Sequence, residues 1–110
     1  MAKALLLAWV SPSGEETDAE LNSWYENTHI PQVRAAIPSV TSVHRYRTAD
    51  LPTGQQPAHR YLAVYEMDSD DVPAAAAALA QAGAAGRLTM TTAMDVTSAP
   101  PALHWYQGIG

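Results

Sequence analysis

The fold is decided by residues 17–31, which read TDAELNSWYENTHIP. Side chains of mainly apolar or aromatic character recur there at the spacing of one α-helical face: Leu21, Trp24, Tyr25, Thr28 and His29. Thr17 and Glu20 match a capping box, which predicts a helix beginning at about Asp18. Because a proline disfavours helical geometry in the residue before it, Pro31 predicts that this helix ends at or near His29, with a short further turn over 32–37.

Strands are predicted on both sides of this helix. Residues 4–10, ALLLAWV, form a continuous apolar run typical of a strand buried on both faces. Residues 40–47 and 59–67 are rich in β-branched and aromatic side chains, and a loop over 49–57 separates them. A second helix is predicted from a cap at 69–73 through Ala82, with Gly83 placed to end it. Residues 103–107 predict the last strand, whereas 83–101 could hold a short helix or an extra strand.

The resulting order, βαββαβ, predicts an α+β fold of the ferredoxin-like type, with an antiparallel sheet carrying both helices on one face. The length of 110 residues suits one domain over 1–110. The bare face of the sheet is expected to carry polar aromatic side chains: His44, Tyr46, Tyr61 and Tyr65. Such a face needs a cover, so we expect a homodimer in which two sheets pair as a dimeric α+β barrel and each subunit keeps a cavity.

Composition excludes several classes of partner. The net charge of −5, with six Lys and Arg in all, argues against nucleic acid, which is bound by clustered cations. The apolar run over 4–10 is too short to cross a membrane and lacks a signal-cleavage pattern, so no membrane association and a cytoplasmic location are expected. The chain has no cysteine, and its four histidines lack metal-ligand spacing. Since there is also no phosphate-binding glycine loop, we expect neither a metal nor an organic cofactor.

One stretch of the chain carries a family resemblance. The residues WYENTHIP at 24–31, together with the βαββαβ order, resemble the EthD-like branch of the dimeric α+β barrel superfamily. That superfamily includes muconolactone isomerases, polyketide and olivetolic acid cyclases, cofactor-free monooxygenases and proteins of unknown role. Its members often use a histidine in this helix or on the barrel face. The long segment 83–101 departs from the compact pattern of the superfamily.

His29 is the first candidate for proton transfer, because it shares a helix face with Leu21 and Tyr25 and so points toward the sheet. A helix C-terminus favours imidazolium whereas burial opposes it, so we expect a pKa near neutrality, as general acid or base work demands. The alternative is a histidine that only caps the carbonyl groups of the last turn. His44 is the second acid or base candidate, and it shares a strand face with Tyr46.

The candidate substrate-binding residues are all aromatic: Trp9, Trp24, Tyr25, Tyr46, Tyr61 and Tyr65. Phenol groups beside an imidazole can bind an enol or a carbonyl oxygen, although buried tyrosines also pack cores with their hydroxyl groups bonded. These observations favour a cofactor-free enzyme that cyclises, isomerises or eliminates within a hydrophobic carbonyl compound, such as a polyketide-derived intermediate. Two alternatives stay open: a cofactor-free monooxygenase, and a non-catalytic accessory protein that binds a small molecule.

Overall fold

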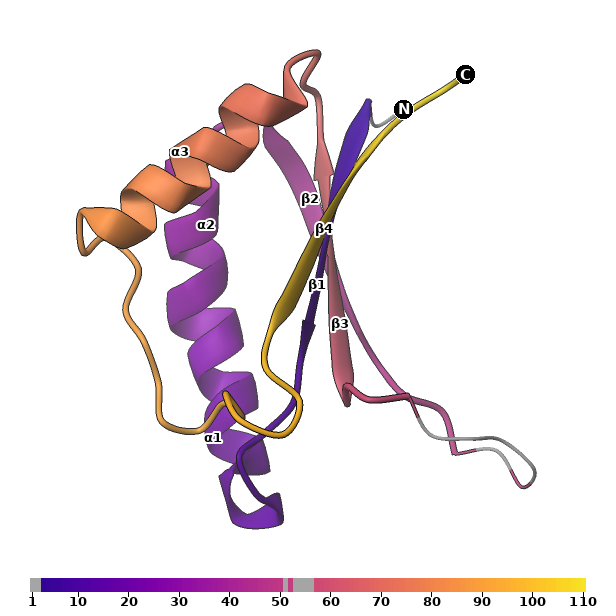
Figure 1. The fold of residues 1–110 in the computed structure, drawn as a ribbon, viewed down its shortest axis with the longest axis vertical. Helices are drawn as coiled ribbons and strands as arrows, with labels where there is room; N and C mark the ends of the chain where they lie inside the picture. Colours follow the sequence, from indigo (N-terminus) through magenta and orange to yellow (C-terminus); the bar gives the residue numbers. More distant parts are fainter. Residues whose placement is uncertain (1–2, 51, 53–56) are drawn as a thin grey trace.

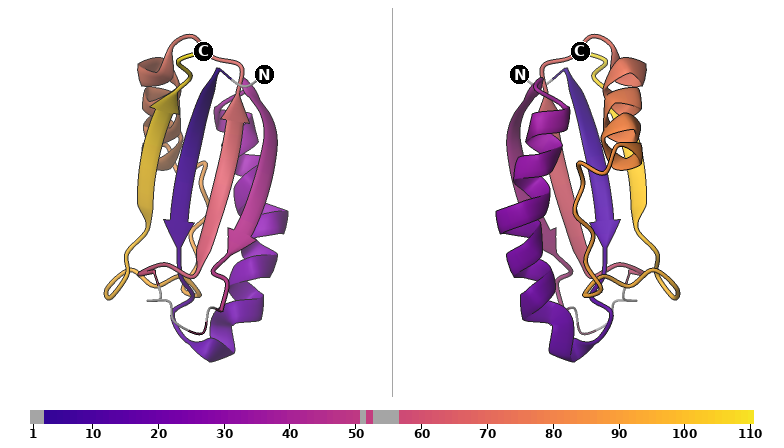
Figure 2. Two further views of the ribbon diagram at one scale, coloured as in Figure 1. Left: turned by 90° about the vertical axis from the view of Figure 1, so that its right-hand side faces the viewer. Right: turned by 90° about the vertical axis from the view of Figure 1, so that its left-hand side faces the viewer.

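The computed structural model describes residues 3–50, 52 and 57–110, and its frame is an antiparallel sheet of four strands. These are β1 (Ala4–Val10), β2 (Val40–Arg47), β3 (Tyr61–Met67) and β4 (Ala102–Gln107), in the order β2-β3-β1-β4. All helices lie on one side of the sheet, which Figure 1 shows edge on and Figure 2 shows from both faces. This arrangement confirms the predicted α+β, ferredoxin-like class. The predicted loop over 49–57 falls partly on residues 51 and 53–56, outside the described residues.

The first helical segment is longer than the sequence analysis predicted. A 3₁₀ turn (η1, Glu15–Thr17) leads into α1 (Asp18–Trp24), a π-turn (η2, Tyr25–His29) and α2 (Ile30–Ala36). The prediction that the helix ends near His29 is therefore wrong. The N–H of Ile30 bonds the carbonyl of Tyr25 five residues back, and this wider turn accommodates Pro31, which has no N–H to donate and would clash with a regular helical turn.

One predicted cap and one predicted helix end also differ from the structure, although α1 begins at Asp18 as predicted. Thr17 does not cap α1 with its side chain; its hydroxyl instead donates to the carbonyl of Gly14, 3.0 Å away. Helix α3 (Val72–Ala84) begins as predicted, with Asp71 accepting from the N–H of Ala74, but it runs through Gly83. It ends at Ala84, two residues later than predicted. A Schellman motif follows, in which the N–H groups of Gly86 and Arg87 bond the carbonyl groups of Gly83 and Ala82, and the φ of 75° at Gly86 suits glycine.

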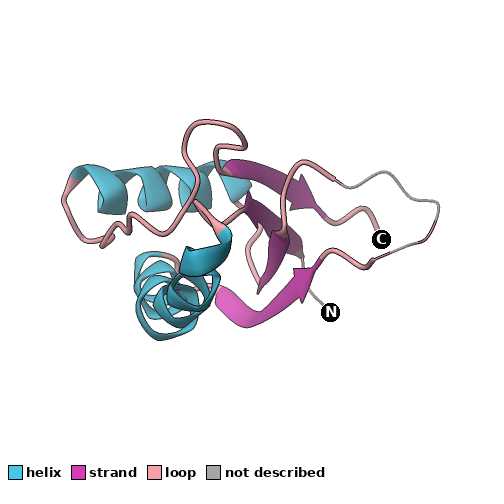
Figure 3. Cartoon of the chain, turned by 90° about the horizontal axis from the view of Figure 1, so that it is seen from below, coloured by secondary structure: helices cyan, strands magenta, loops and turns pink. Residues whose placement is uncertain are grey.

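Residues 87–101, here called the strap, connect α3 to β4. All residues of the strap are described, and they form neither the short helix nor the extra strand considered from the sequence. Their one strand-like contact is an isolated β-bridge between Met94 and Pro12. Hydrogen bonds fasten it beside the end of β1: the N–H of Ser13 donates to the carbonyl of Ala93 at 2.7 Å. Figure 3 shows α3 lengthwise and the other helical segment end on, both on the same side of the sheet.

The two faces of the sheet carry different side chains. The helix-facing side of the central strands is buried and forms the core with α1 to α3: Ala4, Leu6, Ala8, Val10, Tyr61, Ala63, Tyr65 and Met67. In the β2–β3 register, His44 lies opposite Val64 and Tyr46 opposite Leu62, which places this pair on the uncovered face. The prediction that Tyr61 and Tyr65 share that face with His44 and Tyr46 is therefore wrong, because strand alternation alone does not fix the register between neighbouring strands.

Candidate functional site

A cavity of about 490 Å³ lies between the sheet and the helices. Its walls come from β1, β3, β4, the first helical segment, α3 and the strap. Among the described residues, the lining contains no Lys, Arg, Asp or Glu side chain. The lining side chains that carry a nitrogen or oxygen atom belong to Trp24, Tyr25, His29, Tyr65 and Trp105. A largely apolar pocket with a few polar groups is the usual form of a small-molecule site.

His29 is held in this cavity by aromatic contacts. Its ring stacks on Trp24, with centroids 4.6 Å apart, and meets the edge of Tyr25 at 4.8 Å. In a regular α-helix, residues five apart are separated by about 140° around the axis, so their side chains cannot stack. The π-turn brings residue 29 over residue 24 and so makes the Trp24–His29 stack possible.

Burial sets the charge of His29. Its Nδ1 is buried and has no hydrogen-bond partner among the described residues, and burial lowers the pKa of His29 to about 4. The expected pKa near neutrality assumed a helix C-terminus at this residue, and the helix continues to Ala36. Without that negative dipole end, the desolvation of the imidazolium dominates. His29 is therefore a neutral imidazole at pH 7.

Tyr25 and Tyr65 form a buried pair of phenol groups beside His29. Their hydroxyl oxygens are 2.8 Å apart, in a hydrogen bond between the π-turn and β3. Burial raises the pKa of both Tyr25 and Tyr65, so both hydroxyl groups are protonated at neutral pH. A pair of this kind can donate a hydrogen bond to a ligand oxygen that becomes negatively charged.

The strap closes one side of the cavity with Leu88, Met90 and Met94. Thr89 joins the strap to α1 and α2. The indole N–H of Trp24 donates to the Thr89 carbonyl at 3.0 Å, and the Gln32 side chain exchanges two hydrogen bonds with Thr89 at 2.7 and 2.9 Å. The sequence analysis missed these lining residues, because the strap has no hydrophobic periodicity to signal them.

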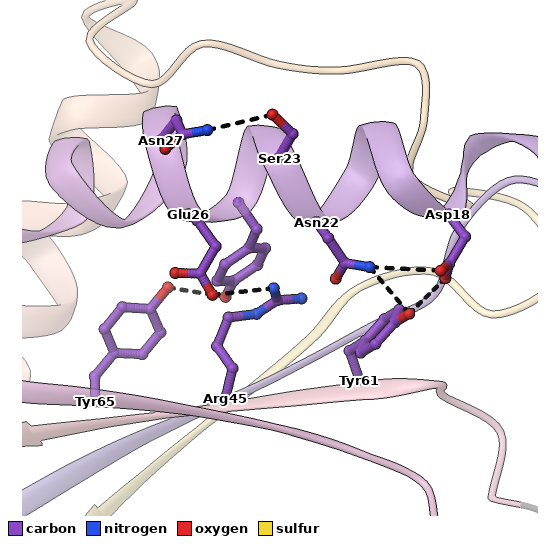
Figure 4. Close-up of polar contacts among 9 residues, drawn as sticks. Asp18, Asn22, Ser23, Glu26, Asn27, Arg45, Tyr61 and Tyr65 are labelled. Atoms are coloured by element: carbon purple, nitrogen blue, oxygen red, sulfur yellow. Dashed lines mark hydrogen bonds and ion pairs between the residues drawn. The ribbon is translucent and has the colours of Figure 1, made fainter.

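The structure brings together four of the eight predicted site residues: Trp24, Tyr25, His29 and Tyr65. Tyr61 lies on the same side of the sheet, but its hydroxyl donates to Asp18 and accepts from Asn22, away from the cavity lining (Figure 4). Trp9, His44 and Tyr46 lie on the uncovered face. There the Nε2 of His44 is 3.4 Å from the Glu66 carboxylate, so His44 does not share a site with His29.

Over residues 3–50, 52 and 57–110, no helix is both long and apolar enough to cross a membrane. Within the same residues, no three His, Asp or Glu side chains gather in a group that could hold a metal ion.

The fold has relatives among solved structures. An EthD-like protein from Ralstonia eutropha JMP134 superposes with a TM-score of 0.58 at 18% identity, covering 97% of this chain and 93% of that one. An ethyl tert-butyl ether D (EthD) family protein from Bacillus halodurans C-125 gives 0.58 at 22% identity, covering 99% and 100%. This chain has the EthD-like fold. HapK from Hahella chejuensis shares it, with a TM-score of 0.55 at 12% identity over 97% and 93% of the two chains.

No protein-family model and no curated protein sequence matches the chain. The EthD-like fold therefore confirms the resemblance carried by residues 24–31 at the level of the fold. Because one fold supports many activities, the function has to be argued from the residues of the cavity.

Proposed function

We propose that this protein is a cofactor-free enzyme that moves a proton within an apolar carbonyl compound, in a cyclisation, isomerisation or elimination. The observation that carries the proposal is one neutral imidazole, His29, in an otherwise apolar cavity beside two protonated phenol groups. A neutral imidazole can accept a proton, and a buried phenol can stabilise the oxyanion that the proton leaves behind.

The roles of the residues follow from this chemistry. His29 removes a proton from the carbon next to the substrate carbonyl, and the electron pair of that C–H bond becomes an enolate. The Tyr25–Tyr65 pair donates a hydrogen bond to the enolate oxygen from the hydroxyl group whose proton is not used between the two tyrosines. The imidazolium then returns its proton to another carbon or to a leaving group, and its charge is stabilised by the adjacent enolate while both are present. Proton transfer by one placed group contributes about 10² to 10⁴ in rate.

The cavity also limits the substrate. A volume of about 490 Å³ suits a small molecule of drug-like size. The lining side chains carry no formal charge at neutral pH among the described residues, so an ionised carboxylate or phosphate would lose its hydration without a partner. These properties support a neutral, mostly hydrocarbon substrate with one or two carbonyl or enol oxygens, such as a polyketide-derived intermediate.

We also expect the protein to act as a homodimer paired through the uncovered face of the sheet. That face carries large side chains without a helix over them, including Tyr46 and Tyr106, each about half exposed. Leu5, Leu7, Leu62 and Val64 lie between these two tyrosines on β1 and β3. Burial of such a face against its own copy is favourable, and an isologous pair of sheets is a common closed arrangement.

The proposed function is tested with 2-tetralone, an apolar bicyclic ketone with acidic α-hydrogens. We expect the protein to accelerate the exchange of these hydrogens for deuterium in D₂O, followed by NMR. Ala76→Phe, which fills the cavity, is expected to abolish the acceleration, whereas Ala77→Phe, on the exposed side of the same helix, should leave it unchanged. Binding of 2-tetralone without exchange in the wild type would contradict the proposal and favour a non-catalytic binding protein. Oxygen uptake with an apolar phenol would instead favour a monooxygenase.

A further inference from the structure

Arg45 is a buried cation behind the cavity wall that the roles above do not use. It lies on the helix-facing side of β2, opposite Ala63, and its side chain is only 13% exposed. The guanidinium carbon is 4.5 Å from the centre of the Tyr25 ring and 5.2 Å from that of Tyr61. Figure 4 shows Arg45 rising from the sheet between Tyr61 and Tyr65 toward the helix that carries Glu26.

The partners of Arg45 do not account for its burial. Among residues 3–50, 52 and 57–110, its one ionic contact is with Glu26, at 3.4 Å. The Glu26 side chain is 57% exposed, so that contact is screened by water. The Nε and Nη2 atoms are buried without a hydrogen-bond partner among the described residues. A guanidinium has five N–H donors, and leaving some of them unpaired in an apolar region lowers stability. We therefore looked to function, and not to stability, for the role of the Arg45 charge.

We propose that Arg45 is a positioning residue that turns the Tyr25–Tyr65 pair into an oxyanion-binding group. Its guanidinium lies over the Tyr25 ring, outside the cavity lining, so it acts through Tyr25 and does not touch a ligand. When a ligand oxygen becomes negative, the pair takes up part of that charge through its hydrogen bonds, and the fixed cation stabilises it. The inference rests on the proposed function, because it supplies the charge that the enolate needs.

The electrostatic surroundings of Tyr25 agree with this role. Burial raises the pKa of Tyr25, while the Tyr65 hydroxyl and the Arg45 charge lower it and Glu26 raises it. Burial is also the main cause that raises the pKa of Tyr65, where the Arg45 charge again lowers the pKa and the Glu26 charge again raises it. His29, the remaining titratable group in contact with the Tyr25 ring, is neutral and adds no charge before the reaction. Arg45 is thus the cation that acts on the tyrosine pair.

The test measures the ionisation of residue 25 in the ligand-free protein. Tyr25→3,5-difluorotyrosine brings this ionisation to a pH at which the protein stays folded, and the fluorine NMR signal reports it. Arg45→Met is expected to raise the midpoint by about one pH unit or more, the usual effect of losing an adjacent opposite charge. Arg45→Lys should restore it to near the wild-type value. Arg47→Met removes a more exposed cation from the same strand face and should leave the midpoint unchanged.

A second variant keeps the inference testable if Arg45→Met does not fold. Arg45→Gln keeps a polar side chain at this position without the positive charge and should also raise the midpoint of residue 25. An unchanged midpoint in folded Arg45→Met, or in Arg45→Gln when Arg45→Met does not fold, would overturn the role of Arg45. Because no ligand is present, this titration is independent of 2-tetralone exchange. If Arg45→Met shifts the midpoint but the wild-type protein does not exchange the hydrogens of 2-tetralone, the proposed function is refuted and the charge effect of Arg45 on Tyr25 stands.

Discussion

The imidazole of His29 stacks on the indole of Trp24, with ring centroids 4.6 Å apart and planes inclined by 21°. This contact joins residues five apart and therefore depends on the π-turn between α1 and α2. It holds the imidazole by its faces, so its buried Nδ1 is left without a hydrogen bond among the described residues. Burial therefore sets the charge state of His29 and makes the stability of the protein depend on pH.

His29 should make the protein less stable as the pH falls from about 6.5 to about 4. Its pKa is about 4 in the folded protein and about 6.5 in an unfolded chain, so the unfolded state binds a proton first. The contribution of the neutral imidazole is therefore complete above pH 6.5 and is lost as the pH falls through this window. Each pKa unit is worth about 1.4 kcal/mol, so a difference of about 2.5 units makes the loss up to about 3.5 kcal/mol.

Urea unfolding at a series of pH values measures this loss. In His29→Gln the free energy of unfolding should vary less between pH 6.5 and pH 4, because the other titratable groups are the same in both proteins. Parallel pH profiles for the two proteins would show that His29 titrates normally in the folded state.

The strap should loosen when its contact with Gln32 is removed. Gln32→Ala deletes both side-chain hydrogen bonds to Thr89, including the one that accepts from the Thr89 N–H at 2.7 Å. The amide of Thr89 should then exchange with solvent at least about tenfold faster, with a loss of about 1 kcal/mol or less in global stability. Hydrogen-exchange NMR measures both. Asn27→Ala removes an exposed amide bonded to Ser23 within the helical segment, away from the strap, and should leave Thr89 protected.

A charge on the uncovered face of the sheet should separate the expected dimer. Leu7 lies on this face, opposite Val64 on β3 and His104 on β4, at the middle of the surface that we expect to be paired. Light scattering should give a dimer for the wild type and for Ala77→Lys, where the new lysine lies on exposed helix surface. Leu7→Lys should give a folded monomer, since a buried lysine would face its own copy across the two-fold axis. A monomeric wild type at micromolar concentration would refute the paired sheets.

The sequence was sufficient for the frame of the fold, because strand patterns and the first helical face are local signals. β1 and β2 have the predicted bounds, and α3 begins after Asp71 as its cap predicts. The helix beyond Pro31 was predicted only as a separate short turn over 32–37, because a proline normally disfavours helical geometry in the residue before it. Apolar residues at 33 and 37 continue the spacing of 21 and 25, a signal that the helical face runs on through the proline.

The candidate site was only half predictable for two physical reasons. Alternation shows which side chains of one strand share a face, but the register between strands decided that Tyr65 faces the helices while His44 does not. The strap supplies Met90 and Met94 to the cavity through tertiary contacts alone, without any periodic pattern.

Arg45 was overlooked because a charged residue in a strand is normally solvated, and its burial is visible only once β2 is placed under the first helical segment.

The exchange of the α-hydrogens of 2-tetralone in His29→Gln tests the central claim most directly. Glutamine keeps a polar side chain of similar reach but cannot take up a proton near neutral pH. If His29 transfers the proton, the exchange rate should fall by about 10² or more, while the affinity for 2-tetralone changes less and the protein stays folded by thermal melting. A well-folded His29→Gln protein that exchanges 2-tetralone at the wild-type rate would contradict the assignment of His29 as the base.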